Sequence, residues 1–147
     1  MTERFETFTV LINRISRNIR KIKNQEMAEY DLRSAHVSCL YYIYKSENTT
    51  ATELCEKCEE DKATISRALD YLEQNGFITC ESKNAKRYKS PLLLTEKGSA
   101  VGKKISDKID SVLDEISVGL SDAERSEFYR SLTVVSRCIE SVANKSR

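Results

Sequence analysis

Apolar residues recur at intervals of three and four positions near both ends of the chain. The N-terminal stripe comprises Phe5, Phe8, Ile12, Ile15, Ile19 and Ile22, and the C-terminal stripe comprises Phe128, Leu132, Val135, Ile139 and Val142. This spacing places the apolar side chains on one face of a helix. The pattern therefore predicts an amphipathic helix at each end, and the basic residues Arg14, Arg17, Arg20, Lys21 and Lys23 are expected on the solvated faces of the first one.

Between the two stripes, capping residues indicate three shorter helices. One begins near Ser34, whose side chain can cap it, and its buried face is expected to comprise Val37, Leu40, Tyr41 and Tyr44. Thr50 followed by Glu53 forms a capping box for the short helix "ATELCEKC". Asp61 caps the next helix, and Gly76 stands where a left-handed residue would end it.

After Gly76 the pattern changes to alternation. "FITCES" is rich in strand-forming residues, "KNAK" resembles a turn, and "RYKSPLLL" provides a second strand that Pro91 limits to an edge or an end. Helical spacing resumes from Thr95 at Val101, Ile105, Ile109, Val112 and Ile116. Gly119 interrupts it, and Ser121 with Glu124 forms a further capping box.

This order of elements predicts a mostly α (α+β) fold, a winged helix-turn-helix with helical extensions. We expect one unit over 1–147, with the winged part at 34–95 and helical dimerisation parts at 1–30 and 96–147. Both terminal stripes have heptad spacing, which suits packing between helices. They predict an isologous homodimer, although a stripe of this kind can also pack within its own chain.

The helix that follows Asp61 has two different faces. Ile65, Leu69 and Leu72 share a face that requires a core, whereas the first turn holds only small, hydroxylated or basic residues. A slim helix front can approach base edges in the DNA major groove. We expect Arg67 to contact guanine, Thr64 and Ser66 to reach phosphates or bases, and Lys62 to contact phosphate. The alternative interpretation is a purely structural helix pair.

The hairpin that follows is basic at its tip. Between positions 83 and 89 stand Lys83, Lys86, Arg87 and Lys89, with no acidic residue. A basic tip next to a recognition helix favours contact with the phosphate backbone or an adjacent minor groove, although basic tips also occur as ordinary soluble turns. Because the net charge is only +1, DNA binding has to come from such local patches.

The block from Thr50 to Gly98, with its basic hairpin and "LLLTEKGSAVGKKI", resembles the multiple-antibiotic-resistance (MarR) family of transcriptional regulators. "GLSDAERSEFYRSL" is similar to the last helix of that family. The resemblance implies an obligate homodimer on a pseudo-palindromic DNA site and a ligand or oxidant that alters DNA affinity. Two features differ from the family pattern: the tip "SKNAKRYK" lacks Asp, and Glu59–Glu60 occupy a turn that often contains Gly.

The remaining candidate residues point to no catalytic chemistry. Common nucleophile, phosphate-loop and zinc-protease motifs are absent, and His36 is the sole histidine, so we expect no enzyme activity and no cofactor. Cys55 and Cys58 could suggest zinc or redox chemistry, but a structural zinc site needs four ligands. Structural thiols are the default interpretation for these two and for Cys39, Cys80 and Cys138, with redox sensing as the alternative.

Three further expectations concern location and partners. The 147 residues contain no long apolar run and no secretory signal at the N-terminus, which predicts a cytoplasmic protein without a membrane span. Tyr41, Tyr42 and Tyr44 are expected in the core, although a small aromatic or phenolic effector could bind beside them. A winged helix that binds another protein, with no DNA partner, is the competing function.

Overall fold

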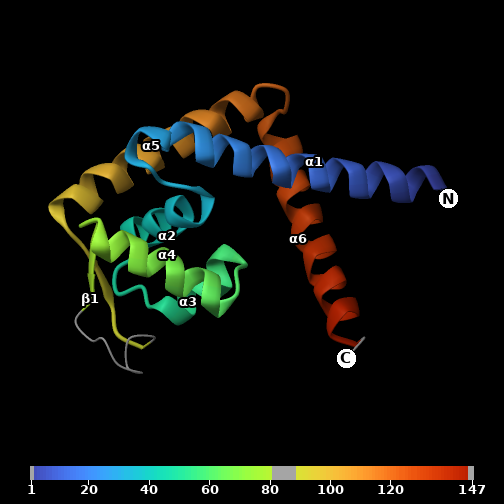
Figure 1. Cartoon of the computed structure of the whole chain (residues 1–147). Coiled ribbons are helices and arrows are strands. Elements are labelled where there is room, and N and C mark those ends of the chain that lie inside the picture. The colour runs from blue at the N-terminus through green and yellow to red at the C-terminus, as the bar shows by residue number, and fades with distance from the viewer. Residues whose placement is uncertain (1, 81–88, 146–147) are drawn as a thin grey trace. The chain divides into compact units, whose positions relative to one another are not determined.

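The computed structural model describes residues 2–80 and 89–145. In the described part, the chain forms α1 (Thr2–Glu26), a short 3₁₀ turn η1 (Ala28–Tyr30), α2 (Ser34–Lys45), α3 (Ala51–Cys58), α4 (Lys62–Gln74), β1 (Ile78–Cys80), β2 (Leu92–Leu94), α5 (Glu96–Ser117) and α6 (Asp122–Lys145) (Figure 1). The predicted order of helices, hairpin and helices is therefore confirmed. The chain divides into two compact units, 1–107 and 108–147.

The hydrophobic core lies in the first unit. Helix α2 packs against α1, α3 and α4, and α4 also contacts β1. The deepest side chains expose no more than 1% of their surface and include Cys39, Leu40, Leu54, Ile65, Leu69, Leu72, Phe77, Ile78 and Ile105. These residues come from helices on both sides of α2 and from the hairpin, so the winged part is held together around α2.

The buried face of α2 differs in part from the expected one. Val37 and Leu40 are buried as predicted, but Cys39 and Ile43 complete the face, while Tyr41 and Tyr44 are only half-buried. The prediction for Tyr41 and Tyr44 was wrong because neighbouring helices on several sides of α2 shift its covered face.

Most predicted caps are present. Thr50 Oγ1 accepts the Glu53 N–H at 3.3 Å, and Glu53 Oε2 accepts the Thr50 N–H at 3.1 Å. Asp61 Oδ1 accepts the Thr64 N–H at 2.7 Å, and Gly76 has the expected positive φ of 75°. The two caps at Thr50 and Asp61 could be predicted from the sequence because each joins residues three positions apart.

The expected cap by Ser34 was wrong. Ser34 is the first residue of α2, and its own N–H donates to Asn24 Oδ1 at 2.7 Å. The preceding N–H, that of Arg33, donates to His36 Nδ1 at 3.0 Å. Asn24 lies on α1, ten positions before Ser34, so only the folded chain brings its side-chain oxygen to the start of α2.

The two strands pair antiparallel, with Ile78 opposite Leu94 and Cys80 opposite Leu92. Pro91 directly precedes β2, which agrees with its predicted place at a strand end. Thr95 precedes α5 and caps it: its Oγ1 accepts the Gly98 N–H at 3.0 Å and donates to the carbonyl of Gly76 at 2.6 Å. Hydrogen bonds of Thr95 therefore connect the end of β2 to the residue that follows α4 and to the first turn of α5.

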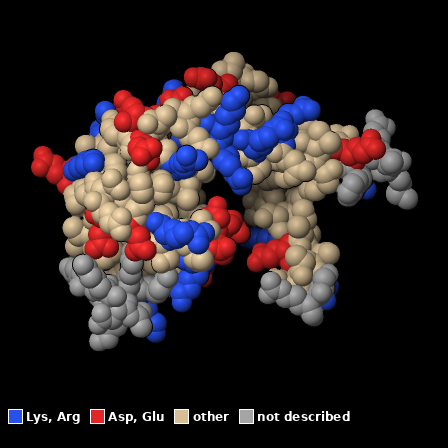
Figure 2. Space-filling view, viewed as in Figure 1, with Lys and Arg blue, Asp and Glu red and all other residues tan. Residues whose placement is uncertain are grey.

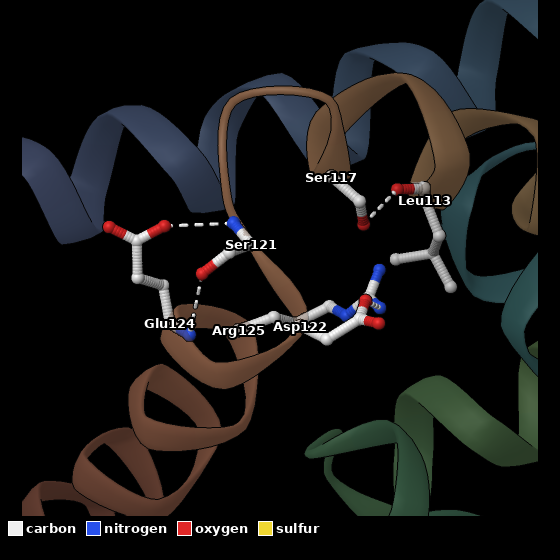
Figure 3. Close-up of polar contacts among 6 residues, drawn as sticks. All are labelled: Leu113, Ser117, Ser121, Asp122, Glu124 and Arg125. Atoms are coloured by element: carbon white, nitrogen blue, oxygen red, sulfur yellow. Dashed lines mark hydrogen bonds and ion pairs between the residues drawn. The ribbon is translucent and has the colours of Figure 1, made fainter.

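The second unit contains the end of α5 and the whole of α6. Ser121 Oγ accepts the Glu124 N–H at 3.3 Å and Glu124 Oε2 accepts the Ser121 N–H at 2.8 Å, so the predicted capping box is confirmed (Figure 3). Asp122 pairs with Arg125 beside it. None of the described α6 side chains is buried. No helix in the described ranges is long and apolar enough to cross a membrane.

Candidate nucleic-acid interface

Helix α4 is anchored from behind, as its pattern predicted. Ile65 and Leu72 are 0% exposed and Leu69 is 1% exposed. The opposite side is accessible. Its four predicted contact residues are all at least partly exposed, with Lys62 and Arg67 exposed and Thr64 and Ser66 half-buried. The first turn of α4 thus combines a fixed position with a surface of small, hydroxylated and basic groups.

The turn between α3 and α4 has the geometry of a helix-turn-helix. Helix α3 ends at Cys58, and Glu59 adopts the left-handed conformation with φ 52°. The Glu60 N–H donates back to the carbonyl of Cys55 at 3.4 Å. A left-handed backbone costs a residue with a side chain roughly 1–2 kcal/mol, and the packed helices on both sides hold this one in place. Glutamate therefore fills the position where the MarR pattern often has glycine.

Hydrogen bonds organise the front of α4. Asp61 accepts the Thr64 N–H, and this backbone bond holds the pKa of the Asp61 carboxyl below its usual range. Arg67 Nη2 donates to Thr64 Oγ1 at 3.3 Å, and the Arg67 charge also contributes to lowering the pKa of Asp61. The sequence interpretation treated Asp61 only as a cap and overlooked its link to Arg67, although the spacing of three positions between Asp61, Thr64 and Arg67 signals it.

This arrangement can bind an anion or a polar edge. The N-terminus of a helix carries a partial positive charge and donor N–H groups, which favour phosphate. Arg67 extends from the same surface, and its bond to Thr64 occupies only one of its guanidinium donors. Its remaining donors can bind a base edge or a phosphate.

Of the four predicted hairpin contacts, the structure describes one. Lys89 is exposed. The other predicted hairpin contacts, Lys83, Lys86 and Arg87, lie outside the described residues. Elsewhere, Figure 2 shows Lys and Arg interspersed with Asp and Glu over the visible face, in keeping with the net charge of +1.

The basic residues of α1 follow the expected pattern with one exception. Arg14, Arg17, Arg20 and Lys21 are exposed, as expected for a solvated face. Lys23 is half-buried and its Nζ donates to Ser38 Oγ at 2.9 Å, so its prediction as a solvated residue was wrong. The C-terminal part of α1 packs against α2, and this contact covers the lysine.

His36 has a structural role in the first unit. Its ring stacks on Tyr71 with centroids 4.3 Å apart, and burial lowers its pKa. Its Nδ1 caps α2 through the Arg33 N–H. In the described part of the chain, no three Cys, His, Asp or Glu side chains come close enough together to hold a metal ion.

The family model of the MarR family matches residues 32–87, which span α2 to the start of the hairpin. This part of the chain is therefore similar to the MarR family. The fold of the chain is the winged helix-turn-helix.

Individual relatives match almost the whole chain. The HTH-type transcriptional regulator BilQ of Clostridioides difficile (strain CD3) is 27% identical over 132 residues, which cover 89% of this chain and 88% of BilQ. A MarR family regulator from Neisseria meningitidis has a TM-score of 0.83 at 20% identity, covering 98% of this chain and 99% of that one. A chain in the S. aureus MepR–DNA complex has a TM-score of 0.77 at 18% identity, and the match covers 90% of this chain and 97% of that one. The two structures support the fold, and none of these relatives is named as an enzyme.

Proposed function

We propose that this chain is a MarR-family transcriptional regulator, a homodimeric repressor that binds a pseudo-palindromic operator and is released by a small-molecule effector. The observation that carries the proposal is the two-sided α4, with its back in the core and its slim, donor-rich front accessible. A helix pair with a purely structural role would require only the buried face of α4. The likeness of the fold to a MepR chain in a DNA complex supports the same interpretation.

We assign base readout to Arg67, because it is exposed and its bond to Thr64 leaves guanidinium donors that suit a bidentate contact to guanine. Thr64 and Ser66 stand beside it with short hydroxyl side chains that let the helix backbone approach the groove. Lys62 is proposed to contact phosphate at the helix N-terminus. In the hairpin, Lys83, Lys86, Arg87 and Lys89 are proposed to contact the phosphate backbone.

The homodimer is proposed from apolar surface that the single chain leaves uncovered. The exposed fractions on α1 are 39–50% for Phe8, Ile12, Ile15 and Ile19, and 49% and 46% for Val10 and Leu11 beside this stripe. On α6 they are 37–65% for Phe128, Leu132, Ile139 and Val142, while Val135 is half-buried. The side chain of Phe5 lies outside the described residues.

Apolar patches of this extent usually mark an interface. A second copy supplies the same stripes, so each copy can cover the other's apolar faces. An isologous dimer would place two α4 helices about one DNA turn apart, which suits a pseudo-palindromic site.

The effector is proposed from the tyrosines of α2. Tyr41, Tyr42 and Tyr44 are half-buried, and the Tyr41 and Tyr42 rings meet edge to face at 5.2 Å. Partly exposed aromatic rings can stack on a small aromatic or phenolic molecule. A thermal-shift screen of small aromatic acids and phenols tests this part. Stabilisation that is lost in Tyr41→Ala supports it, and no stabilisation by any compound contradicts it.

The central experiment is selection of binding sites from a random DNA duplex pool, followed by anisotropy titration at about 50 and 200 mM salt. We expect an inverted repeat with half-sites about one turn apart. Six to ten phosphate contacts would weaken binding by roughly a thousandfold or more between these salt concentrations. Recovery of no motif, together with weak and salt-insensitive binding, would mean that the front of α4 meets a protein.

A substitution then tests the assigned readout. Arg67→Ala should lower the affinity for the selected site by about 1–3 kcal/mol and relax the preference at one base pair. Arg14→Ala is the matched control, because Arg14 is exposed on α1 and carries the same charge. If Arg67→Ala bound the selected site as tightly as the parent and the Arg14→Ala variant, the readout assignment would be wrong.

A further inference from the structure

Arg67, the residue proposed to read a base, is held by a side chain of its own helix. Its Nη2 donates to Thr64 Oγ1 at 3.3 Å, and the two residues stand three positions apart in the first two turns of α4. Residues at this spacing are neighbours on a helix surface. Because Thr64 comes first in the chain, the bond draws the guanidinium group toward the N-terminal end of α4, where the slim front of the helix lies.

Thr64 is itself fixed in place. Its N–H donates to Asp61 Oδ1 at 2.7 Å, and Ile65, the next residue, is 0% exposed in the core. The side chain of Thr64 is half-buried, and a β-branched side chain has few rotamers available on a helix. The acceptor that Arg67 uses therefore has little freedom of its own, so the bond to it restricts the longer arginine side chain.

The chemistry of this acceptor suits an arginine that has to bind something else. A hydroxyl is neutral and leaves the guanidinium charge intact, whereas a carboxylate partner would neutralise that charge and compete with a base. Arginine has five N–H donors, and a bidentate contact to guanine uses two of them. Arg67 can therefore keep its bond to Thr64 while it contacts a base.

We propose that Thr64 is a positioning residue, which presets the guanidinium group of Arg67 for base readout and needs no DNA contact of its own. This inference rests on the proposed DNA-binding function and deepens it. An arginine side chain has many rotamers, and immobilising it on binding lowers affinity. A bond that exists before DNA arrives removes part of this loss, so the Thr64 hydroxyl contributes to affinity through Arg67.

The test is a double-mutant cycle, measured by anisotropy titration on the duplex that the parent chain selects. Thr64→Val removes the hydroxyl but keeps the shape of the side chain and the backbone N–H that Asp61 caps. It should weaken binding roughly two- to tenfold, the range expected for one rotamer-rich side chain. Thr64→Ser retains the acceptor and should bind almost as tightly as the parent. In the Arg67→Ala background, Thr64→Val should have no further effect.

Sequence preference provides a second readout. Thr64→Val should relax the preference at the same base pair that Arg67→Ala relaxes, whereas loss of a phosphate contact would weaken all sequences alike. Thr133→Val is the matched control and should bind like the parent, because Thr133 is exposed on α6 and its hydroxyl donates to the carbonyl of Tyr129 in the same helix.

The outcomes separate this inference from the proposed function. If Thr64→Val weakened binding equally in the parent and in the Arg67→Ala background, Thr64 would contact DNA directly and the positioning role would be wrong. Parent-like binding by Thr64→Val would also overturn that role and leave the proposed function intact. A parent chain that selected no duplex would overturn the proposed function, and this inference with it.

A measurement without DNA examines the bond itself. NMR relaxation of the Arg67 Nε–H group should report a more ordered side chain in the free parent than in Thr64→Val. The same group of Arg14, which is exposed on α1, should be equally ordered in both chains. Equal order of Arg67 in the two chains would contradict a preset guanidinium group.

Discussion

Helices α4 and α6 carry apolar stripes of similar spacing but have opposite surroundings. Leu69 and Leu72 of α4 are 1% and 0% exposed, whereas Leu132 and Ile139 of α6 are 37% and 50% exposed. The periodicity identifies the apolar face of each helix, but it does not say which chain covers that face. In α4 the cover comes from the winged part itself, and for α6 we propose that it comes from a second copy.

Helix α5 shows both conditions along one stripe. Val101 and Ile105 are 4% and 1% exposed, but Ile116 is 63% exposed. The first two lie in the unit that contains the core, and the last lies in the second unit. The sequence spacing continues through this change without a break, so the change is a property of the tertiary structure.

The largest effect is expected from crowding the winged part. A Cβ at Gly98 would lie 1.8 Å from the backbone oxygen of Phe77, and neither the hairpin nor α5 can move aside without breaking their bonds to Thr95. Gly98→Ala should therefore destabilise the winged unit by roughly 4 kcal/mol or more, at the upper end of overpacking effects. Denaturant unfolding followed by circular dichroism measures this change.

Gly119 provides the matched substitution in the other region. A Cβ there would meet no atom within 4 Å. Gly119→Ala should change the free energy of unfolding by less than about 1 kcal/mol. Equal losses in the two variants would mean that the close approach at Gly98 does not constrain the fold.

The next effect separates burial within a chain from burial between chains. Leu69→Ala should lower the free energy of unfolding by about 3 kcal/mol at every protein concentration, because its cavity forms in the core. Ile139→Ala should weaken association of the proposed dimer, so the variant should dissociate at a higher protein concentration than the parent does. Denaturation and light scattering over a wide concentration range compare the two. Dissociation of Ile139→Ala and the parent at the same protein concentration would contradict the proposed interface.

Helix caps should behave alike in both regions, because a cap acts within one turn. Asp61→Ala removes the acceptor for the Thr64 N–H, and Ser121→Ala removes the acceptor for the Glu124 N–H. Each should cost about 1 kcal/mol. Parallel thermal unfolding measurements compare the two variants. A loss of stability several times larger for one cap than for the other would contradict the expectation that caps act locally.

The smallest effect is expected from His36, the one histidine of the chain. Burial and the neighbouring Arg33 lower its pKa in the folded chain, so the unfolded chain takes up a proton first as the pH falls. The contribution of His36 is therefore complete above about pH 6.5 and decreases below it. His36→Gln should flatten the dependence of stability on pH between about 7 and 5. An unchanged slope would contradict this role of His36.

Local signals in the sequence determined much of the fold. The capping boxes at Thr50 and Ser121, the cap at Asp61 and the left-handed Gly76 were all predicted, because each depends on residues within one turn. The two faces of α4 also followed from spacing alone. These features define the helices and the candidate DNA-binding surface.

The tertiary structure decided which distant residues meet. At the start of α2, the side chains of Asn24 and His36 accept the backbone N–H groups in place of the expected Ser34 cap. Lys23 is half-buried through its contact with Ser38. Contacts of this kind depend on how α1, α2 and α3 pack, and the spacing of residues along one helix carries no information about the side chains that a neighbouring helix brings to it.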